Sequence, residues 1–137
     1  VKQDYISFNS SSLNKILSNS DIISFHCRPN KDGSSIITKK EINLMKKNCI
    51  LINTARGNLI NESDLGHALK NDLVKGAALD VYQNEPAKDN ELFGLNNIIL
   101  TPHIAASTDE AQIIVAEMIA NQFCEFFNNK KITNSVT

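Results

Sequence analysis

The sequence predicts an α/β fold built on a parallel sheet, and two observations support this prediction. Short apolar runs, rich enough in β-branched residues to be buried strands, alternate with amphipathic helical patterns. The alternation occurs four times with short connections, an order that produces parallel strands, right-handed crossovers and helices on both faces of the sheet. A length of 137 residues is enough for one domain with a core, and we find no linker in it.

The first predicted helix follows Ser12 and ends near Asn19, because a serine hydroxyl can cap the free N–H groups at a helix start. The first predicted strand is Ile22–Cys27. It is apolar on both faces, as expected of an interior strand with a neighbour on each side. A polar turn over residues 28–35 then leads to the next helix.

The second helix begins with a capping box, Thr38–Glu41. The second strand, Cys49–Ile52, is an apolar run that stops at Asn53. Asn61 then caps the third helix. The predicted inner face of this helix consists of Leu65, Ala68, Leu69 and Leu73.

Two further strands and a long helix complete the predicted elements. The strand Ala77–Val81 is followed by a turn-rich loop over residues 82–97, and Ile98–Leu100 is the fourth strand. A long helix begins at about Ser107 and ends in the polar segment 128–131. Its apolar positions at helical spacing are Ala111, Ile114, Val115, Met118, Ile119, Phe123 and Phe126.

The opening half of a dinucleotide-binding sheet is missing from this pattern. Such a sheet begins with a strand, a G-x-G-x-x-G turn and an acidic residue about 20 residues later, whereas the five glycines here are scattered. Without an earlier neighbour, Ile22–Cys27 would leave a bare edge. We therefore expect residues 1–137 to be the second half of a Rossmann-type doubly wound parallel sheet, followed by a long C-terminal helix, within a longer natural chain. Such a partial domain is expected to be inactive when isolated.

Composition and charge argue against several classes of function. The formal net charge is −1, so no strong field favours a nucleic acid or an anionic membrane as a partner. No apolar stretch approaches the roughly 20 residues that a membrane span needs. The three cysteines, Cys27, Cys49 and Cys124, form no close pair, which argues against a disulfide framework or a zinc site. They are expected to be buried reduced thiols, as suits a cytoplasmic protein.

Four side chains suited to chemistry follow the predicted strands: Arg56, Asp80, Glu85 and His103. The carboxyl ends of parallel strands open onto one edge of a sheet, where such sheets bind ligands. A guanidinium can hold a carboxylate through two parallel hydrogen bonds, and a histidine beside a carboxylate is the usual pair for proton transfer. Each residue also has a structural interpretation, as a cap, a loop charge or a helix-entry residue, but their joint position favours an active site.

The motifs around these residues resemble those of the D-isomer-specific 2-hydroxyacid dehydrogenases. They are Asn53–Gly57 (N-T-A-R-G), Gly76–Val81 (G-A-A-L-D-V), Asn84–Pro86 (N-E-P) and Thr101–Thr108 (T-P-H-I-A-A-S-T). The resemblance covers essentially the whole chain, in the family's order and spacing. Residues 106–112 and 132–137 look most like the D-3-phosphoglycerate dehydrogenase branch, which implies 3-phosphoglycerate as the substrate.

The resemblance implies an oxidoreductase that uses NAD, and it assigns roles to individual residues. Arg56 would bind the carboxylate of a 2-hydroxy acid or 2-keto acid, His103 would be the acid/base, and Glu85 would pair with His103. Asp80 would lie beside the nicotinamide end of the cofactor. The resemblance also implies a homo-oligomer for the intact protein. The cofactor-binding residues that it implies are Cys27, Thr54, Ala55, Arg56, Asp80, His103 and Ala106.

The family pattern has two departures here, and it leaves two alternative functions. Arg28 stands where many members have the proline of a His-x-Pro motif, and Ala105 stands where the family often has glycine.

The C-terminal-binding corepressors, which use the same fold as an NAD(H)-responsive scaffold, can carry the same arginine, glutamate and histidine. Formate dehydrogenase chemistry needs no acid/base carboxylate, so Glu85 beside His103 speaks against it.

Overall fold

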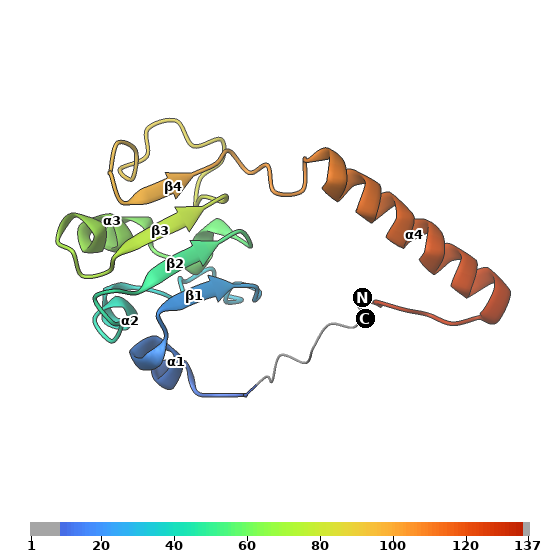
Figure 1. Cartoon of the computed structure of the whole chain (residues 1–137), viewed down its shortest axis with the longest axis horizontal. Coiled ribbons are helices and arrows are strands. Elements are labelled where there is room, and N and C mark those ends of the chain that lie inside the picture. Colours follow the sequence, from blue (N-terminus) through green and yellow to red (C-terminus); the bar gives the residue numbers. More distant parts are fainter. Residues whose placement is uncertain (1–8, 136–137) are drawn as a thin grey trace. The chain divides into compact units, whose positions relative to one another are not determined.

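A computed structural model of the chain describes residues 9–135 (Figure 1). The chain divides after Pro102 into two compact units. The second unit contains a single long helix, α4 (Asp109–Asn129). The elements of the first unit are α1 (Leu13–Asn19), β1 (Ile22–Phe25), α2 (Lys39–Ile42), β2 (Ile50–Asn53), the 3₁₀ helix η1 (Gly57–Leu59), α3 (Glu62–Lys70), β3 (Gly76–Leu79) and β4 (Ile98–Leu100).

The strands form one four-stranded parallel sheet in the order β1-β2-β3-β4, which confirms the predicted fold class. The four strands and the intervening helices lie where the sequence pattern predicts them, except that α3 ends at Lys70, before Leu73 of its predicted inner face. The bounds of three strands differ from the prediction. β1 ends at Phe25 rather than at Cys27, β2 is Ile50–Asn53 rather than Cys49–Ile52, and β3 is Gly76–Leu79 rather than Ala77–Val81. β1 and β3 end where the pairing with the neighbouring strand ends.

The core lies against one face of this sheet. Alternate strand residues point to this face, and Leu51 and Leu79 are examples that are almost completely buried. The helices α1, α2 and α3 contribute Leu17, Ile42 and Leu65 to the same buried cluster. Residues 9–102 therefore form a two-layer structure, with helices on one side of the sheet and with the apolar side chains of both layers interdigitated.

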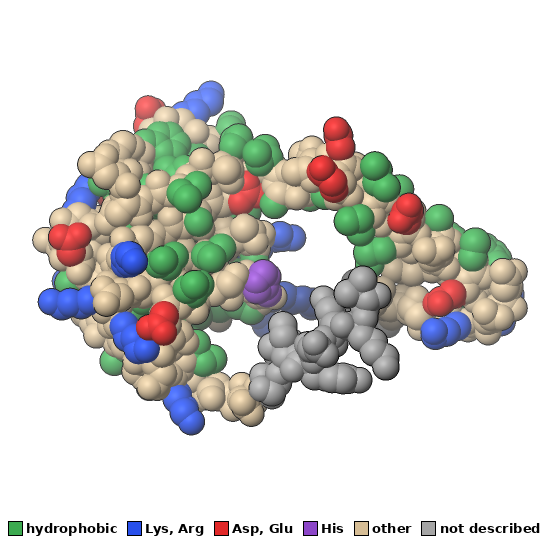
Figure 2. All heavy atoms as spheres, viewed as in Figure 1, with side chains coloured by type: hydrophobic (Ala, Val, Ile, Leu, Met, Phe, Trp, Pro, Cys, Tyr) green, Lys and Arg blue, Asp and Glu red, His purple; other side chains and the backbone are tan. Residues whose placement is uncertain are grey.

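The opposite face of the sheet is uncovered within residues 9–102. Ile22 and Ile99 on this face are 59% and 69% exposed, and Ile50 and Ile52 between them are only half-buried. Figure 2 shows hydrophobic side chains over the strands on the side turned to the viewer. The prediction of helices on both faces is wrong for the first unit, because α1, α2 and α3 all pack on the other side.

The helix α4 has 21 residues and begins two residues after its predicted start. Its N-cap is Thr108, whose hydroxyl accepts a hydrogen bond from the N–H of Ala111 at 3.2 Å. The helix ends at Asn129, and the C-cap residue Lys130 adopts the left-handed conformation with φ of 53°. Beyond it, the Thr133 hydroxyl donates to Glu125 at 3.3 Å, so the chain folds back along the last turns of the helix. No helix within residues 9–135 is long and apolar enough to span a membrane.

The three cysteines differ in exposure, which corrects the prediction that all of them are buried. Cys49 is fully buried before β2, whereas Cys27 and Cys124 are exposed. Cys27 lies beyond the end of β1, and Cys124 lies on α4, none of whose residues is buried. Burial raises the pKa of the Cys49 thiol above its ordinary value, and the Asp21 carboxylate adds to the shift.

A thiol reagent should therefore modify Cys27 and Cys124 in the native protein and reach Cys49 only after unfolding. The thiolate is the reactive form, and burial both excludes the reagent and disfavours the thiolate. Mass spectrometry after a short pulse of iodoacetamide measures the labelling. The double variant Cys27→Ser, Cys124→Ser should take no label when native and one label in denaturant. Labelling of the native double variant would contradict the burial of Cys49.

Candidate active site

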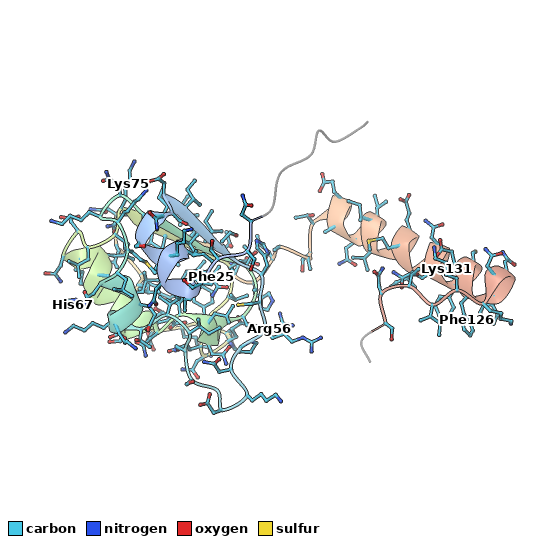
Figure 3. The ribbon with its side chains drawn as sticks, turned by 90° about the horizontal axis from the view of Figure 1, so that it is seen from below. Phe25, Arg56, His67, Lys75, Phe126 and Lys131 are labelled. Atoms are coloured by element: carbon cyan, nitrogen blue, oxygen red, sulfur yellow. The ribbon has the colours of Figure 1, made fainter. Side chains whose placement is uncertain are left out.

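The loop after β2 carries Arg56 and is shaped by the buried side chain of Asn53. Asn53 is 1% exposed and ends the strand. Its Oδ1 accepts a hydrogen bond from the N–H of Ala55 at 3.1 Å, and its Nδ2 donates to the carbonyl of Arg56 at 2.9 Å. These two bonds turn the chain at the carboxyl edge of the sheet. The Arg56 side chain is exposed at this edge (Figure 3), where one guanidinium N–H donates to the Ala55 carbonyl at 2.6 Å.

Gly57 brings the loop after β2 against the loop after β3. A Cβ atom at position 57 would lie 1.9 Å from both the carbonyl carbon and the carbonyl oxygen of Tyr82, and 2.5 Å from the nitrogen of Gln83. No side chain fits between two backbones at this separation. The segment that carries Arg56 and the segment that leads to Glu85 are therefore in direct backbone contact.

Glu85 lies on the loop after β3, with its side chain exposed. One of its carboxylate oxygens, Oε1, accepts a hydrogen bond from the N–H of Tyr82 at 2.9 Å. A hydrogen bond of this kind fixes the direction of the carboxylate relative to the backbone that packs on Gly57. Arginine and glutamate thus come from two adjoining loops at one edge of the sheet.

Asp80 follows β3 and is 3% exposed. Its backbone N–H donates to the carbonyl of Asn53 at 3.0 Å, and its Oδ1 accepts from the hydroxyl of Thr101 at 2.5 Å. The buried Tyr82 hydroxyl donates to the carbonyl of Thr101 at 2.9 Å. Burial, with the Asp80 carboxylate as a second cause, raises the pKa of Tyr82 above its usual range. These bonds join the ends of β2, β3 and β4.

His103 follows the end of β4 and is the first residue of the second unit. Its φ of 55° lies in the left-handed region, which is uncommon outside glycine and is found at turns and functional sites. Thr101, the residue fixed by the Asp80 and Tyr82 contacts, lies two positions before it.

The other predicted cofactor-binding residues are distributed over both units. Cys27 and Thr54 are exposed just past the ends of β1 and β2, and Ala55 is half-buried in the Asn53 turn. Ala106 belongs to the second unit, where its carbonyl accepts from the Gln112 side chain. The first unit thus brings Arg56, Asp80 and Glu85 to adjoining positions, whereas His103 and Ala106 follow in the second.

Sequence reasoning missed the residues that hold this edge together. An asparagine that ends an apolar run just before a turn is a signal for the hydrogen bonds that Asn53 makes. Gly57 could have been noted as a position that needs space. Nothing in the sequence pattern indicated that Tyr82 and Thr101 would bind each other. Within residues 9–135, no group of three or more His, Cys, Asp and Glu side chains is arranged to hold a metal ion.

Comparison with known proteins places these residues in a family context. The family model described as "D-isomer specific 2-hydroxyacid dehydrogenase, NAD binding domain" matches residues 1–105. The chain is 41% identical over 124 residues to a D-3-phosphoglycerate dehydrogenase of Methanocaldococcus jannaschii, covering 90% of the chain and 24% of that protein. It is also 41% identical over 126 residues to a glyoxylate reductase of Thermococcus litoralis, covering 92% of the chain and 37% of that protein.

Solved structures show the same likeness. A glyoxylate reductase from Paecilomyes thermophila is 32% identical with a TM-score of 0.77, and the match covers 92% of this chain and 38% of that one. An acyclic imino acid reductase, Bsp5, in complex with NADPH and D-Arg is 35% identical with a TM-score of 0.80, and the match covers 99% of this chain and 43% of that one. The chain therefore spans less than half the length of each of these proteins.

Proposed function

This chain belongs to the D-isomer-specific 2-hydroxyacid dehydrogenase family, and on that premise we propose that residues 1–137 are part of the NAD-binding domain of an enzyme that oxidises a D-2-hydroxy acid. We further propose 3-phosphoglycerate as the substrate. The observation that carries the proposal is the backbone contact of Gly57 with Tyr82, because it sets the arginine and glutamate loops side by side. The enzyme is expected to be a cytoplasmic homo-oligomer.

Each polar residue has a role in this proposal. The exposed guanidinium of Arg56 binds the substrate carboxylate, a planar group that suits its paired donors. His103 takes the proton of the 2-hydroxyl during oxidation and returns it during reduction. Glu85 pairs with His103 and holds the imidazole in the orientation that this transfer needs. Asp80 keeps the end of β4, from which the histidine segment leaves, attached to β3 through Thr101.

The residues at the carboxyl edge fit the nicotinamide end of a dinucleotide. Thr54 offers a hydroxyl at the end of β2, Cys27 is exposed at the end of β1, and Asp80 supplies a buried carboxylate at the end of β3. The scattered glycines provide no turn for the pyrophosphate, so the fit concerns only one end of the cofactor. When bound, NAD accepts the hydride from the hydroxyl-bearing carbon.

A substrate panel tests the proposal. The natural protein that contains this chain is assayed for NAD reduction with 3-phosphoglycerate, glycolate and D-lactate, and kcat/KM is expected to be highest for 3-phosphoglycerate. A higher value for glycolate would replace the proposed substrate, since a glyoxylate reductase is equally similar to the chain. Binding of NADH without turnover of any hydroxy acid would contradict the proposed enzymatic function and favour the NAD(H)-responsive scaffold function.

Arg56→Ala should weaken substrate capture in this assay. Loss of hydrogen bonds to a charged group costs about 1.5–3 kcal/mol, which corresponds to a loss of roughly 10-fold or more in kcat/KM for the hydroxy acid. KM for NAD should rise by less than KM for the hydroxy acid, because Arg56 is one of several residues implied in cofactor binding. Arg56→Lys keeps the charge but not the planar fork, and we expect it to recover only part of the loss. An unchanged KM for the hydroxy acid in Arg56→Ala would exclude this residue from substrate binding.

A further inference from the structure

The loop that carries Glu85 needs a support outside itself. Residues 80–97 contain neither helix nor strand. Two hydrogen bonds join this loop to Glu62, the first residue of α3. The backbone N–H of Gln83 donates to Oε1 of Glu62 at 2.6 Å, and Nδ2 of Asn90 donates to its Oε2 at 2.7 Å.

These two bonds hold the loop on both sides of Glu85. Gln83 precedes Glu85 in the sequence, and Asn90 follows it. Both oxygens of Glu62 are used, and hydrogen bonds to an ionised carboxylate are about twice as strong as neutral ones. A polar hollow of about 340 Å³ lies between the start of α3 and residues 83–91, so this part of the loop is held mainly by polar contacts, while the buried Leu92 anchors the loop further along the chain.

Glu62 is itself held by the start of its helix. The N-cap residue Asn61 accepts a hydrogen bond from the N–H of Asp64 at 2.9 Å, and its own N–H donates to the carbonyl of the buried Ile37 at 2.8 Å. The next turn of α3 places Leu65 in the core with no exposed surface. A carboxylate in the first turn is also favoured by the helix dipole. The start of α3 thus holds the backbone of Glu62 in place, so that its side chain can position the loop that carries Glu85.

We infer that Glu62 is a positioning residue that fixes the loop on both sides of Glu85 and so keeps that carboxylate at a constant place on the carboxyl edge. The role of Glu85 in this inference rests on the proposed function. Glu62 acts through the backbone of Gln83 and the side chain of Asn90.

The first variant is Glu62→Gln, which preserves the size of the side chain but replaces one acceptor oxygen by an NH₂ group. That group would face a donor, either the N–H of Gln83 or the amide of Asn90. The matched control is Asp64→Asn, which removes the same charge from the same turn of α3. Asp64 accepts from the N–H of Lys39 at 2.8 Å, and so it holds the start of α2 instead of the loop.

Amide hydrogen exchange at Gln83, measured by NMR on the natural protein, tests the hold on the loop without any activity assay. In Glu62→Gln the exchange of the Gln83 amide should become about tenfold faster or more, because a hydrogen bond to a charged group is lost. Asp64→Asn should leave it unchanged. Glu62→Asp keeps the charge, but the aspartate side chain is too short to reach both donors. In this variant the exchange rate of the Gln83 amide should lie between those of the wild type and Glu62→Gln.

The pH profile of kcat/KM tests the link to Glu85 in the natural protein. In Glu62→Gln the pH at which kcat/KM for hydroxy acid oxidation falls on the acidic side should shift in the same direction as in Glu85→Gln. The shift should be smaller than in Glu85→Gln. In the double variant the Glu62 change should produce no further shift. A uniform fall in kcat/KM without this shift would overturn the positioning role, as would unchanged exchange of Gln83. If the wild-type protein oxidises no hydroxy acid, the proposed function fails, while the exchange measurement still decides whether Glu62 holds the loop.

Discussion

His103→Ala is expected to lower kcat for hydroxy acid oxidation by about 10²–10⁴-fold, the usual contribution of a general acid/base. The proton of the 2-hydroxyl must leave as the hydride departs, and alanine offers no acceptor for it. Steady-state kinetics over a range of hydroxy acid concentrations separate this effect from binding. We expect kcat and kcat/KM to fall together, because the lost interaction is made in the transition state.

A matched histidine variant controls for general damage. His67 lies exposed on α3 (Figure 3), where its backbone carbonyl accepts hydrogen bonds from the backbone and the side chain of Asn71. His67→Ala should therefore leave kcat at the wild-type value. Wild-type kcat in His103→Ala would remove this histidine from the mechanism, whatever the substrate.

Gly57→Ala is expected to destabilise the protein by about 1–3 kcal/mol or more, the cost of inserting a group into a closely packed place. The new Cβ would lie 1.9 Å from the carbonyl of Tyr82, and a backbone can yield only if the two loops separate. Equilibrium unfolding in urea measures the loss as a lower midpoint. Activity should fall as well, because Arg56 and Glu85 lie on the loops that move apart.

Gly66→Ala is the control for this substitution. Gly66 lies within α3, and a Cβ there would meet Leu92 Cδ2 at 3.4 Å, an ordinary contact. Because alanine is favoured over glycine inside a helix by roughly 0.5–1 kcal/mol, this variant should be as stable as the wild type or more stable. An unchanged urea midpoint in Gly57→Ala would show that the two loops can separate without cost.

The sequence was sufficient for the elements and their order but not for the contacts that shape the candidate site. Helix caps are local, so Thr38 and Asn61 could be identified from neighbouring residues, and both cap as predicted. Ser12 precedes α1 as predicted, but its hydroxyl makes no capping hydrogen bond. The short parallel strands could be identified from apolar runs. Their ends could not, because a strand ends where its partner's hydrogen bonds end rather than where apolar residues end.

Contacts between segments that are distant in the sequence could not be predicted from the local sequence pattern. The hydrogen bond of Tyr82 to Thr101 and the bonds of Glu62 to the loop join residues about 20 or more positions apart. The exposure of Cys27 has a similar cause, because the apolar residues near it in the sequence do not cover its side chain in the folded chain. The roles of Arg56, Glu85 and His103 stay predictions that the kinetic variants can decide.

The uncovered face of the sheet concentrates the stability of residues 9–102 in one interface. Free energy from apolar burial is roughly proportional to the area withdrawn from water, and Ile22 and Ile99 withdraw little. The sandwich of sheet and helices on the other side must then offset nearly all the conformational entropy lost by this unit on folding. No second apolar layer within these residues can compensate when that interface is damaged. Each methylene group lost between the sheet and α1, α2 or α3 therefore weakens the whole unit, and with it the loops that the sheet supports.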